Sequence, residues 1–175
     1  MVYYTTYSSS IGELLLFCDG HRLIGLFQRG QKYFPEQMIM EAVKVEHHPC
    51  LDQAKDWLER YFAGQKPNPL ELPLEPKGTP FQKEVWNLLL EIPYGSVTTY
   101  QEIAKALAKK KHLPTMSCQA VGGAVGHNPL SILIPCHRVI GSNGDLTGYA
   151  LGLEKKKFLL TLEQVDLKKR FTYAK

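Results

Sequence analysis

The chain has 175 residues, 44% of them hydrophobic and 10% aromatic, which is enough to build a packed core in one domain or two small ones. No apolar run approaches the ~20 residues that a membrane-spanning helix needs, and the first residues lack a signal-peptide pattern. We therefore expect a soluble, cytoplasmic protein without a membrane partner. The net charge of +4 permits nucleic-acid binding but does not establish it.

The first third of the chain has the pattern of a small α/β domain. Residues 2–6, 14–17 and 23–28 are predicted to form short strands. Apolar residues recur at helical spacing over 51–61, and Gly64 suits the end of that helix. No catalytic constellation is visible in this part.

Four cysteines occur without a CxxC pair, so neither a zinc ribbon nor a thioredoxin-type motif is indicated, and reduced thiols are expected. His47, His48 and Cys50 form a small cluster ahead of the predicted helix. Zinc sites need four ligands at suitable spacing, and no matching set is present. The sequence therefore predicts a polar loop here and no bound metal.

Five prolines lie between residues 67 and 80, a density that neither a helix nor a central strand tolerates. We interpret 67–80 as a linker. It divides the chain into an N-terminal domain, 1–66, and a C-terminal domain, 81–175.

Helical patterns dominate after the linker, beginning with a helix over 81–90 and ending with a helix over 153–164. Their expected buried residues are Val85, Trp86 and Leu89 in the first helix, and Phe158, Leu159 and Leu162 in the last.

Two short helices joined by a lysine-rich turn are predicted between them. Thr99 followed by Glu102 is a capping-box signature for one helix, and the other covers 117–125. Such a pair is typical of a helix-turn-helix, although generic helix pairs are common. Gly122-Gly123 inside the second helix costs roughly 1 kcal/mol per glycine relative to alanine, which predicts close approach of another backbone or of a ligand.

The most informative segment places Cys136 directly before His137 and Arg138, after an apolar stretch at 132–134 that reads as a buried strand. The thiolate is the reactive form of cysteine, and its free pKa of about 8.5 falls when a cation or an imidazole is near. Cys136 is therefore a candidate nucleophile. The alternative is a buried structural cysteine beside a basic pair.

This segment, with 120–124, Asn128-Pro129 and Gly148-Tyr149, resembles the O6-alkylguanine-DNA alkyltransferases, also called methylated-DNA–protein-cysteine methyltransferases. The resemblance is strong from about residue 78 to residue 163 and weak before that. It implies an α+β fold, with a small N-terminal α/β domain of the ribonuclease H-like type. A mainly helical C-terminal domain follows, with a winged helix-turn-helix-like DNA-binding unit.

The resemblance also implies a reaction, the direct repair of double-stranded DNA that contains O6-alkylguanine, with O4-methylthymine as a second candidate substrate. The alkyl group moves to the sulfur of Cys136 after the damaged base is flipped out of the duplex. Because a thioether does not exchange with thiols as a disulfide does, each molecule should react once. No cofactor is required, and we expect a monomer.

Four residues carry the chemistry in this interpretation. Cys136 is the nucleophile, His137 acts on it as a base through a water, and Glu163 orients His137. Tyr100 donates a proton toward guanine N3, or to a phosphate, as the base leaves. On local grounds alone, Glu163 is an exposed acid near a helix end and Tyr100 a packing residue.

The residues that the resemblance assigns to the substrate pocket are Val139, Tyr149, Ala150, Asn128 and Arg138. Val139 would accept the guanine amino group through its backbone carbonyl, and Tyr149 and Ala150 would face O6 and the base. Asn128 would act as a hinge between the helix pair and the active-site strand. Arg138 is expected to brace the site rather than to touch the substrate.

The expected DNA contacts are Gln119, Ala120, Gly122, Thr99, Lys109 and Lys110. Gln119 stands where many members have an arginine finger, and Leu151 stands where many have a glycine, which narrows the pocket for large adducts. Two further basic runs, 155–157 and 168–170, could contact phosphates or form solvated faces.

Two other classes of protein share part of this pattern. Alkyltransferase-like proteins bind alkylated bases but lack the acceptor cysteine, which this chain has as Cys136. Regulators of the adaptive response carry an additional N-terminal region with several cysteines, for which the chain has neither the room nor the pattern. The suicide alkyltransferase is therefore the leading hypothesis, and the non-catalytic lesion-binding protein is the alternative.

Overall fold

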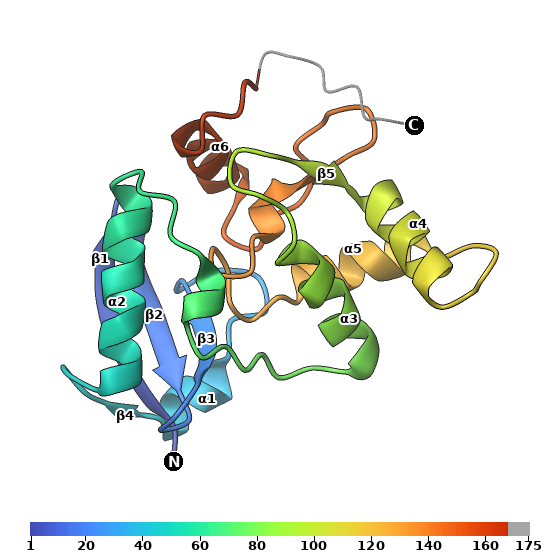
Figure 1. The fold of residues 1–175 in the computed structure, drawn as a ribbon. Coiled ribbons are helices and arrows are strands. Elements are labelled where there is room, and N and C mark those ends of the chain that lie inside the picture. Colours follow the sequence, from blue (N-terminus) through green and yellow to red (C-terminus); the bar gives the residue numbers. More distant parts are fainter. Residues whose placement is uncertain (168–175) are drawn as a thin grey trace. The chain divides into compact units, whose positions relative to one another are not determined.

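The computed structural model describes residues 1–167 and divides them into two compact units (Figure 1). Unit 1 consists of Met1–Lys77 together with Pro129–Leu133, and unit 2 consists of Gly78–Asn128 and the chain from Ile134 onward. The change between the units at Lys77 and Gly78 falls inside the proline-rich segment 67–80. Most of that segment belongs to unit 1, so it is not a free connection.

Unit 1 is a four-stranded sheet with helices packed against it (Figure 1). The sheet has the order β3-β2-β1-β4, antiparallel except where β1 and β4 run parallel. Its elements are β1 (Tyr3–Ser9), β2 (Gly12–Cys18), β3 (Leu23–Phe27), α1 (Glu36–Glu41), β4 (Val43–Lys44), α2 (Pro49–Phe62) and the short 3-10 helix η1 (Pro69–Glu71). The predicted strands and the predicted helix over 51–61 are thus confirmed.

Both faces of the sheet are covered, because β3 and the last five residues of β2 are buried on both sides. Leu15 and Phe17 on β2 join a cluster with α1, and α2 packs against the same strand from the other side. At the start of α2, the His48 side chain accepts a hydrogen bond from the Cys50 amide at 3.3 Å and so caps the helix. Among residues 1–167, no three His, Cys, Asp or Glu side chains are placed to hold a metal ion.

The outer edge of β3 is paired by two segments that come from elsewhere in the chain. The Leu23 amide donates to the Pro73 carbonyl at 2.7 Å, and the Leu26 amide donates to the Pro129 carbonyl at 2.8 Å. These contacts join the middle of the proline-rich segment and the short stretch Pro129–Leu133 to unit 1. An edge strand with unpaired amides is stabilised by any segment that supplies carbonyls.

Unit 2 is mainly helical, with one two-stranded parallel sheet (Figure 1). Its elements are α3 (Pro80–Leu89), β5 (Thr98–Thr99), α4 (Tyr100–Lys110), α5 (Cys118–Gly126), the 3-10 helix η2 (Cys136–Arg138), β6 (Val139–Ile140) and α6 (Leu153–Leu162). The predicted buried residues of the first helix are confirmed, and the Trp86 indole donates to the Ala124 carbonyl at 2.8 Å. That bond fixes α3 against α5.

Three local predictions need correction. The stretch 132–134, predicted to be a buried strand, is buried but forms a turn in which Ile132 has a φ of +74°. Thr99 caps α4 by accepting from the Glu102 amide at 3.0 Å without the reciprocal bond of a capping box, whereas a complete capping box is formed by Thr79 and Gln82 at the start of α3. In α6, Phe158 is 41% exposed, so its assignment to the buried face is wrong. No helix within residues 1–167 combines the length and apolar character required to cross a bilayer.

Candidate active site

Cys136 opens the single turn η2, between Pro135 and the strand β6. Only 5% of its surface is exposed, and its amide donates to the Ile134 carbonyl at 2.7 Å. The parallel pairing of β6 with β5 sets Val139 beside Thr98, and β5 leads directly into α4 at Tyr100. The small sheet therefore brings the start of α4 to the segment that carries the thiol.

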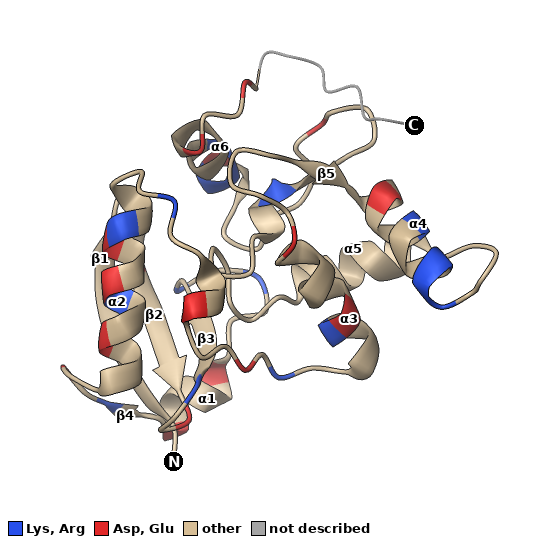
Figure 2. Ribbon diagram, viewed as in Figure 1, with Lys and Arg blue, Asp and Glu red and all other residues tan. Residues whose placement is uncertain are grey.

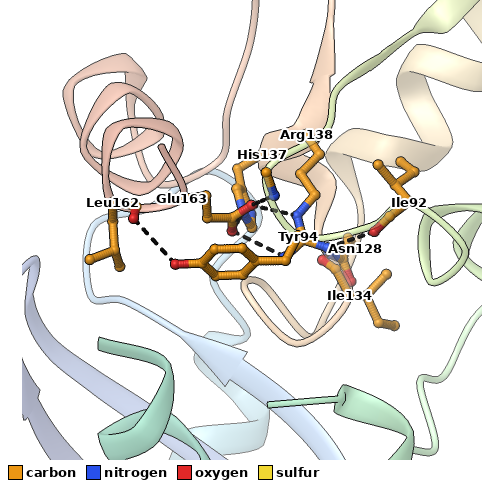
Figure 3. A network of polar contacts seen from close by, with 9 residues as sticks. Ile92, Tyr94, Asn128, Ile134, His137, Arg138, Leu162 and Glu163 are labelled. Carbon is orange, nitrogen blue, oxygen red and sulfur yellow. Dashed lines mark hydrogen bonds and ion pairs between the residues drawn. The ribbon is translucent and has the colours of Figure 1, made fainter. Parts of the chain in front are cut away.

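His137, Arg138 and Glu163 form a buried network (Figure 3). His137 Nε2 lies 2.5 Å from one oxygen of the Glu163 carboxylate, and Arg138 Nε donates to the other oxygen at 2.7 Å. Arg138 Nη1 also donates to the Ile92 carbonyl at 2.7 Å. The Arg138 guanidinium is thus used inside the protein, as a brace for Glu163.

The charges in this network follow from burial and pairing. Burial alone would raise the pKa of Glu163, but the hydrogen bonds and positive charges of His137 and Arg138 outweigh it, and the pKa falls well below its usual range. Burial lowers the pKa of His137, and Glu163 only partly offsets that effect. Near pH 7 the pair is therefore an ionised carboxylate and a neutral imidazole.

The position of the imidazole proton follows from the partner of each ring nitrogen. Since His137 Nε2 faces the carboxylate, it carries the proton, and Nδ1 is left with its lone pair. Nδ1 is buried and makes no hydrogen bond to any residue in 1–167. The ring can therefore accept a proton at Nδ1 while Glu163 holds Nε2–H.

Two tyrosines lie in the electrostatic environment of Cys136. Burial raises the pKa of both Tyr100 and Tyr149, and negative charge on Cys136 raises each further. Both phenols therefore remain protonated and able to donate. The Tyr100 hydroxyl donates to the Thr147 carbonyl at 3.0 Å, and the buried Tyr149 hydroxyl has no partner among residues 1–167.

Lys156 is a site residue that the sequence analysis did not identify. Its ammonium is fully buried and donates to the carbonyls of Val139 at 2.6 Å, Gly148 at 3.0 Å and Thr147 at 3.1 Å. Burial lowers its pKa to about 8, while Cys136 acts in the opposite direction. One ammonium thus connects β6 to the loop that carries Tyr149.

A sequence signal for Lys156 does exist. Lys156, Leu159, Leu160 and Glu163 recur at spacings of three and four, and all four are buried, so they share one face of α6. Reading 155–157 as a basic run obscured this spacing, because only its middle member points inward. The signal is a lysine and a glutamate at helical spacing on the same face as two leucines.

Asn128, Ala150 and Leu151, which were also predicted to lie at or near the substrate pocket, are buried or half-buried. Asn128 is buried, and its side-chain amide donates to the Ile134 carbonyl at 2.8 Å, two residues before the thiol (Figure 3). Leu151 is buried and Ala150 is half-buried. Asn128 therefore links the end of α5 to the nucleophile segment.

The first turn of α5 is exposed at Gln119 and Ala120. A Cβ added at Gly122 would meet only the Tyr100 ring, at 3.9 Å, and one added at Gly123 would meet no atom within 4 Å. The close backbone approach expected for these glycines is therefore absent among the described residues. The face of α5 that they open is available to a ligand.

Basic residues occur at the end of α4, before the turn that leads to α5 (Figure 2). Lys109 and Lys110 are exposed in the last turn of α4, whereas Lys111 pairs with Glu84 of α3 at 3.0 Å. Thr99 is 2% exposed and its hydroxyl caps α4, so its side chain is buried, and its contact with DNA stays a prediction. The basic run 168–170 lies outside the described residues.

Comparison with known proteins decides the family. Residues 80–165 match the DNA-binding domain, and residues 2–76 the ribonuclease-like domain, of 6-O-methylguanine DNA methyltransferase. The chain belongs to the 6-O-methylguanine DNA methyltransferase family. The match confirms the predicted α+β fold class and the resemblance from which it came.

Individual relatives of this family align along almost the whole chain. A methylated-DNA–protein-cysteine methyltransferase of Methanosarcina acetivorans is 45% identical over 163 residues, covering 93% of this chain and 98% of that protein. The protein of the same name from Haemophilus influenzae is 40% identical, covering 94% and 87%.

Two solved structures of related proteins are similar to this chain. The Mycobacterium tuberculosis O6-methylguanine methyltransferase superposes with a TM-score of 0.79 at 40% identity, covering 94% of this chain and 93% of that one. The OGT of that organism in complex with DNA superposes with a TM-score of 0.78 at 38% identity, covering 93% and 92%.

Proposed function

We propose that this protein repairs alkylated DNA directly, by transferring the alkyl group from guanine O6 to the sulfur of Cys136 in a reaction that each molecule performs once. The proposal rests on the buried hydrogen-bonding network next to the Cys136 thiol. His137, next to Cys136, has Nε2 held by Glu163 and Nδ1 without a partner among residues 1–167. Membership of the methyltransferase family supports the same reaction.

The proposed chemistry begins with a proton transfer. The Cys136 thiol gives its proton, through a water, to Nδ1 of neutral His137, and the imidazolium is stabilised by the ionised Glu163. The thiolate then attacks the alkyl carbon, forming a carbon–sulfur bond as the carbon–O6 bond breaks. The bonding electrons leave with guanine, and the Tyr100 phenol supplies a proton at guanine N3.

Substrate binding in this proposal uses groups that are already positioned. The Val139 carbonyl accepts from Lys156 and retains a second lone pair for the guanine amino group. Tyr149 and Ala150 face O6 and the base. Tyr100 donates to Thr147 in this structure, so its hydroxyl exchanges that acceptor for the base when DNA binds.

DNA approaches the open face of α5 in this proposal. Gln119 fills the gap left by the flipped base, and the lack of side chains at Gly122 and Gly123 lets the DNA backbone come close. Lys109 and Lys110 attract phosphates without regard to sequence. O6-alkylguanine as the preferred lesion, a monomeric state and a cytoplasmic location remain predictions.

Intact mass after incubation with O6-methylguanine DNA tests the proposal. We expect a gain of one methyl group per protein, located on the peptide that contains Cys136. Cys136→Ser should abolish the gain and retain DNA binding, whereas Cys118→Ser, which changes an exposed thiol of α5, should leave it intact. Repeated turnover, or methylation of Cys118, would contradict the proposal, and tight binding without a mass change would favour a lesion-binding protein.

A further inference from the structure

The turn between α3 and β5 lies beside the carboxylate of Glu163 (Figure 3). None of its residues is among the proposed reacting groups. The Tyr94 hydroxyl donates to the Leu162 carbonyl at 3.2 Å, and the Gly95 amide donates to the Glu163 carboxylate at 3.3 Å. In the same turn, the Ile92 carbonyl accepts from Arg138. Three residues of one short turn therefore form hydrogen bonds with Glu163, with Leu162 before it in the chain, or with its ion-pair partner Arg138.

Glu163 needs such support because of its position on α6. It is the residue that ends the helix, where the last backbone carbonyls lack helical partners and the dipole is negative. A carboxylate is unfavourable there. The Tyr94 hydroxyl binds one of those carbonyls, that of Leu162, and so reduces the negative potential beside Glu163.

Tyr94 also contacts the cation that pairs with Glu163. The centre of its ring lies 5.8 Å from the Arg138 guanidinium carbon, within the range of a cation–π interaction. One side chain thus touches Arg138 with its ring and the end of α6 with its hydroxyl. Moving Tyr94 would disturb both restraints on the carboxylate.

We propose that Tyr94 is a positioning residue for alkyl transfer, which holds the end of α6 so that Glu163 keeps its hydrogen bond to His137. The inference rests on the proposed role of Glu163 as the group that orients His137. Its effect on the reaction is transmitted through Glu163 and through Arg138, which braces Glu163.

Gly95 supports the same assignment. Its φ of +82° is strained for any residue with a side chain, and a Cβ would lie 3.2 Å from the Glu163 carbonyl oxygen. The turn can therefore come this close to the end of α6 only with glycine at position 95.

Tyr94→Phe is the test, because it removes the hydroxyl and keeps the ring over Arg138. We expect methyl transfer from duplex DNA to slow about fivefold, the factor that corresponds to one hydrogen bond of ordinary net strength. The pH at which Cys136 reacts with a small electrophile should rise, because a less firmly held Glu163 stabilises the imidazolium, and with it the neighbouring thiolate, less well. DNA affinity should be unchanged.

The matched control is Tyr7→Phe, which removes a tyrosine hydroxyl that donates to Glu59 in unit 1 at 3.1 Å. It should leave both the rate and the pH profile as in the wild type. In the double variant Tyr94→Phe/Glu163→Gln, the rate should equal that of Glu163→Gln alone, because the two residues act in series.

A Tyr94→Phe pH profile that superimposes on the wild type would overturn the inference, even if thermal stability falls. Additive slowing in the double variant would also overturn it. If Glu163→Gln itself leaves the pH profile unchanged, the proposed role of Glu163 is wrong. If Glu163→Gln shifts the profile and Tyr94→Phe does not, only the role of Tyr94 is wrong.

Discussion

Lys156→Met tests the most unusual electrostatic feature of this protein. The substitution replaces a fully buried ammonium, held by three backbone carbonyls, with an uncharged side chain of similar length. Burial lowers the lysine pKa from its ordinary 10.5 to about 8 in the folded protein. The folded state therefore releases this proton at a lower pH than the unfolded chain does.

The sign and size of the effect follow from proton linkage. Between pH 8 and pH 10.5 the unfolded chain binds more protons at this site, so folding becomes more favourable as the pH rises. With these two pKa values, the lysine adds ~2 kcal/mol to the free energy of unfolding between pH 7 and pH 9.5. A methionine adds nothing over the same interval.

Urea unfolding of both proteins at pH 7 and pH 9.5 measures the effect. The stability of the wild type relative to Lys156→Met should increase by ~2 kcal/mol at the higher pH, and the comparison cancels the other groups that titrate in both proteins. Lys157→Met is the control, because the Lys157 side chain is 52% exposed and should show no such change. A relative change below ~0.5 kcal/mol, the usual range of surface substitutions, would refute the assignment of a buried charged lysine.

Three further predictions concern activity. Glu163→Gln should slow methyl transfer by ~10²–10⁴-fold and raise the pH at which Cys136 reacts with a small electrophile, as followed by quenched-flow and mass spectrometry; an unchanged pH profile would leave Glu163 a packing role only. Gln119→Ala should slow repair of duplex DNA much more than reaction with free O6-benzylguanine, which needs no base flipping; equal slowing would mean that Gln119 shapes the pocket. Replacing Lys109 and Lys110 by alanine should weaken DNA binding and flatten its salt dependence, as measured by fluorescence anisotropy. Lys111→Ala, which removes a residue paired with Glu84, should change the slope of the salt dependence less. Equal slopes in the two variants would mean that Lys109 and Lys110 are solvated and do not contact DNA phosphates.

The secondary structure of both units could be predicted because its signals are local. The strands of unit 1, the helix α2 that ends just before Gly64 and the buried face of α3 all follow from periodicity and turn residues within a few positions of each other. Phe158 shows the limit of that method. It directly precedes the buried Leu159 and Leu160 in sequence, but its position around the axis of α6 leaves it exposed.

The candidate reacting groups were also visible in the sequence. Cys136 and His137 are adjacent, and the resemblance supplied Glu163 and Tyr100 by their distance along the chain. Their environment was not visible. Whether Glu163 is an exposed acid or a buried partner of His137 depends on the packing of α6 against η2. These two elements are far apart in the sequence.

The amino-acid sequence by itself determined most of the helices and strands, the candidate nucleophile and the family, because each depends on neighbouring residues or on a contiguous motif. Only the tertiary structure decided that Lys156 is buried, that Arg138 braces Glu163, and that the Tyr94 turn reaches the end of α6. The physical reason is that the cost of burying a charge is offset by partners that the fold brings together from distant segments. Local sequence carries the charge, and the fold determines which carbonyls and carboxylates surround it.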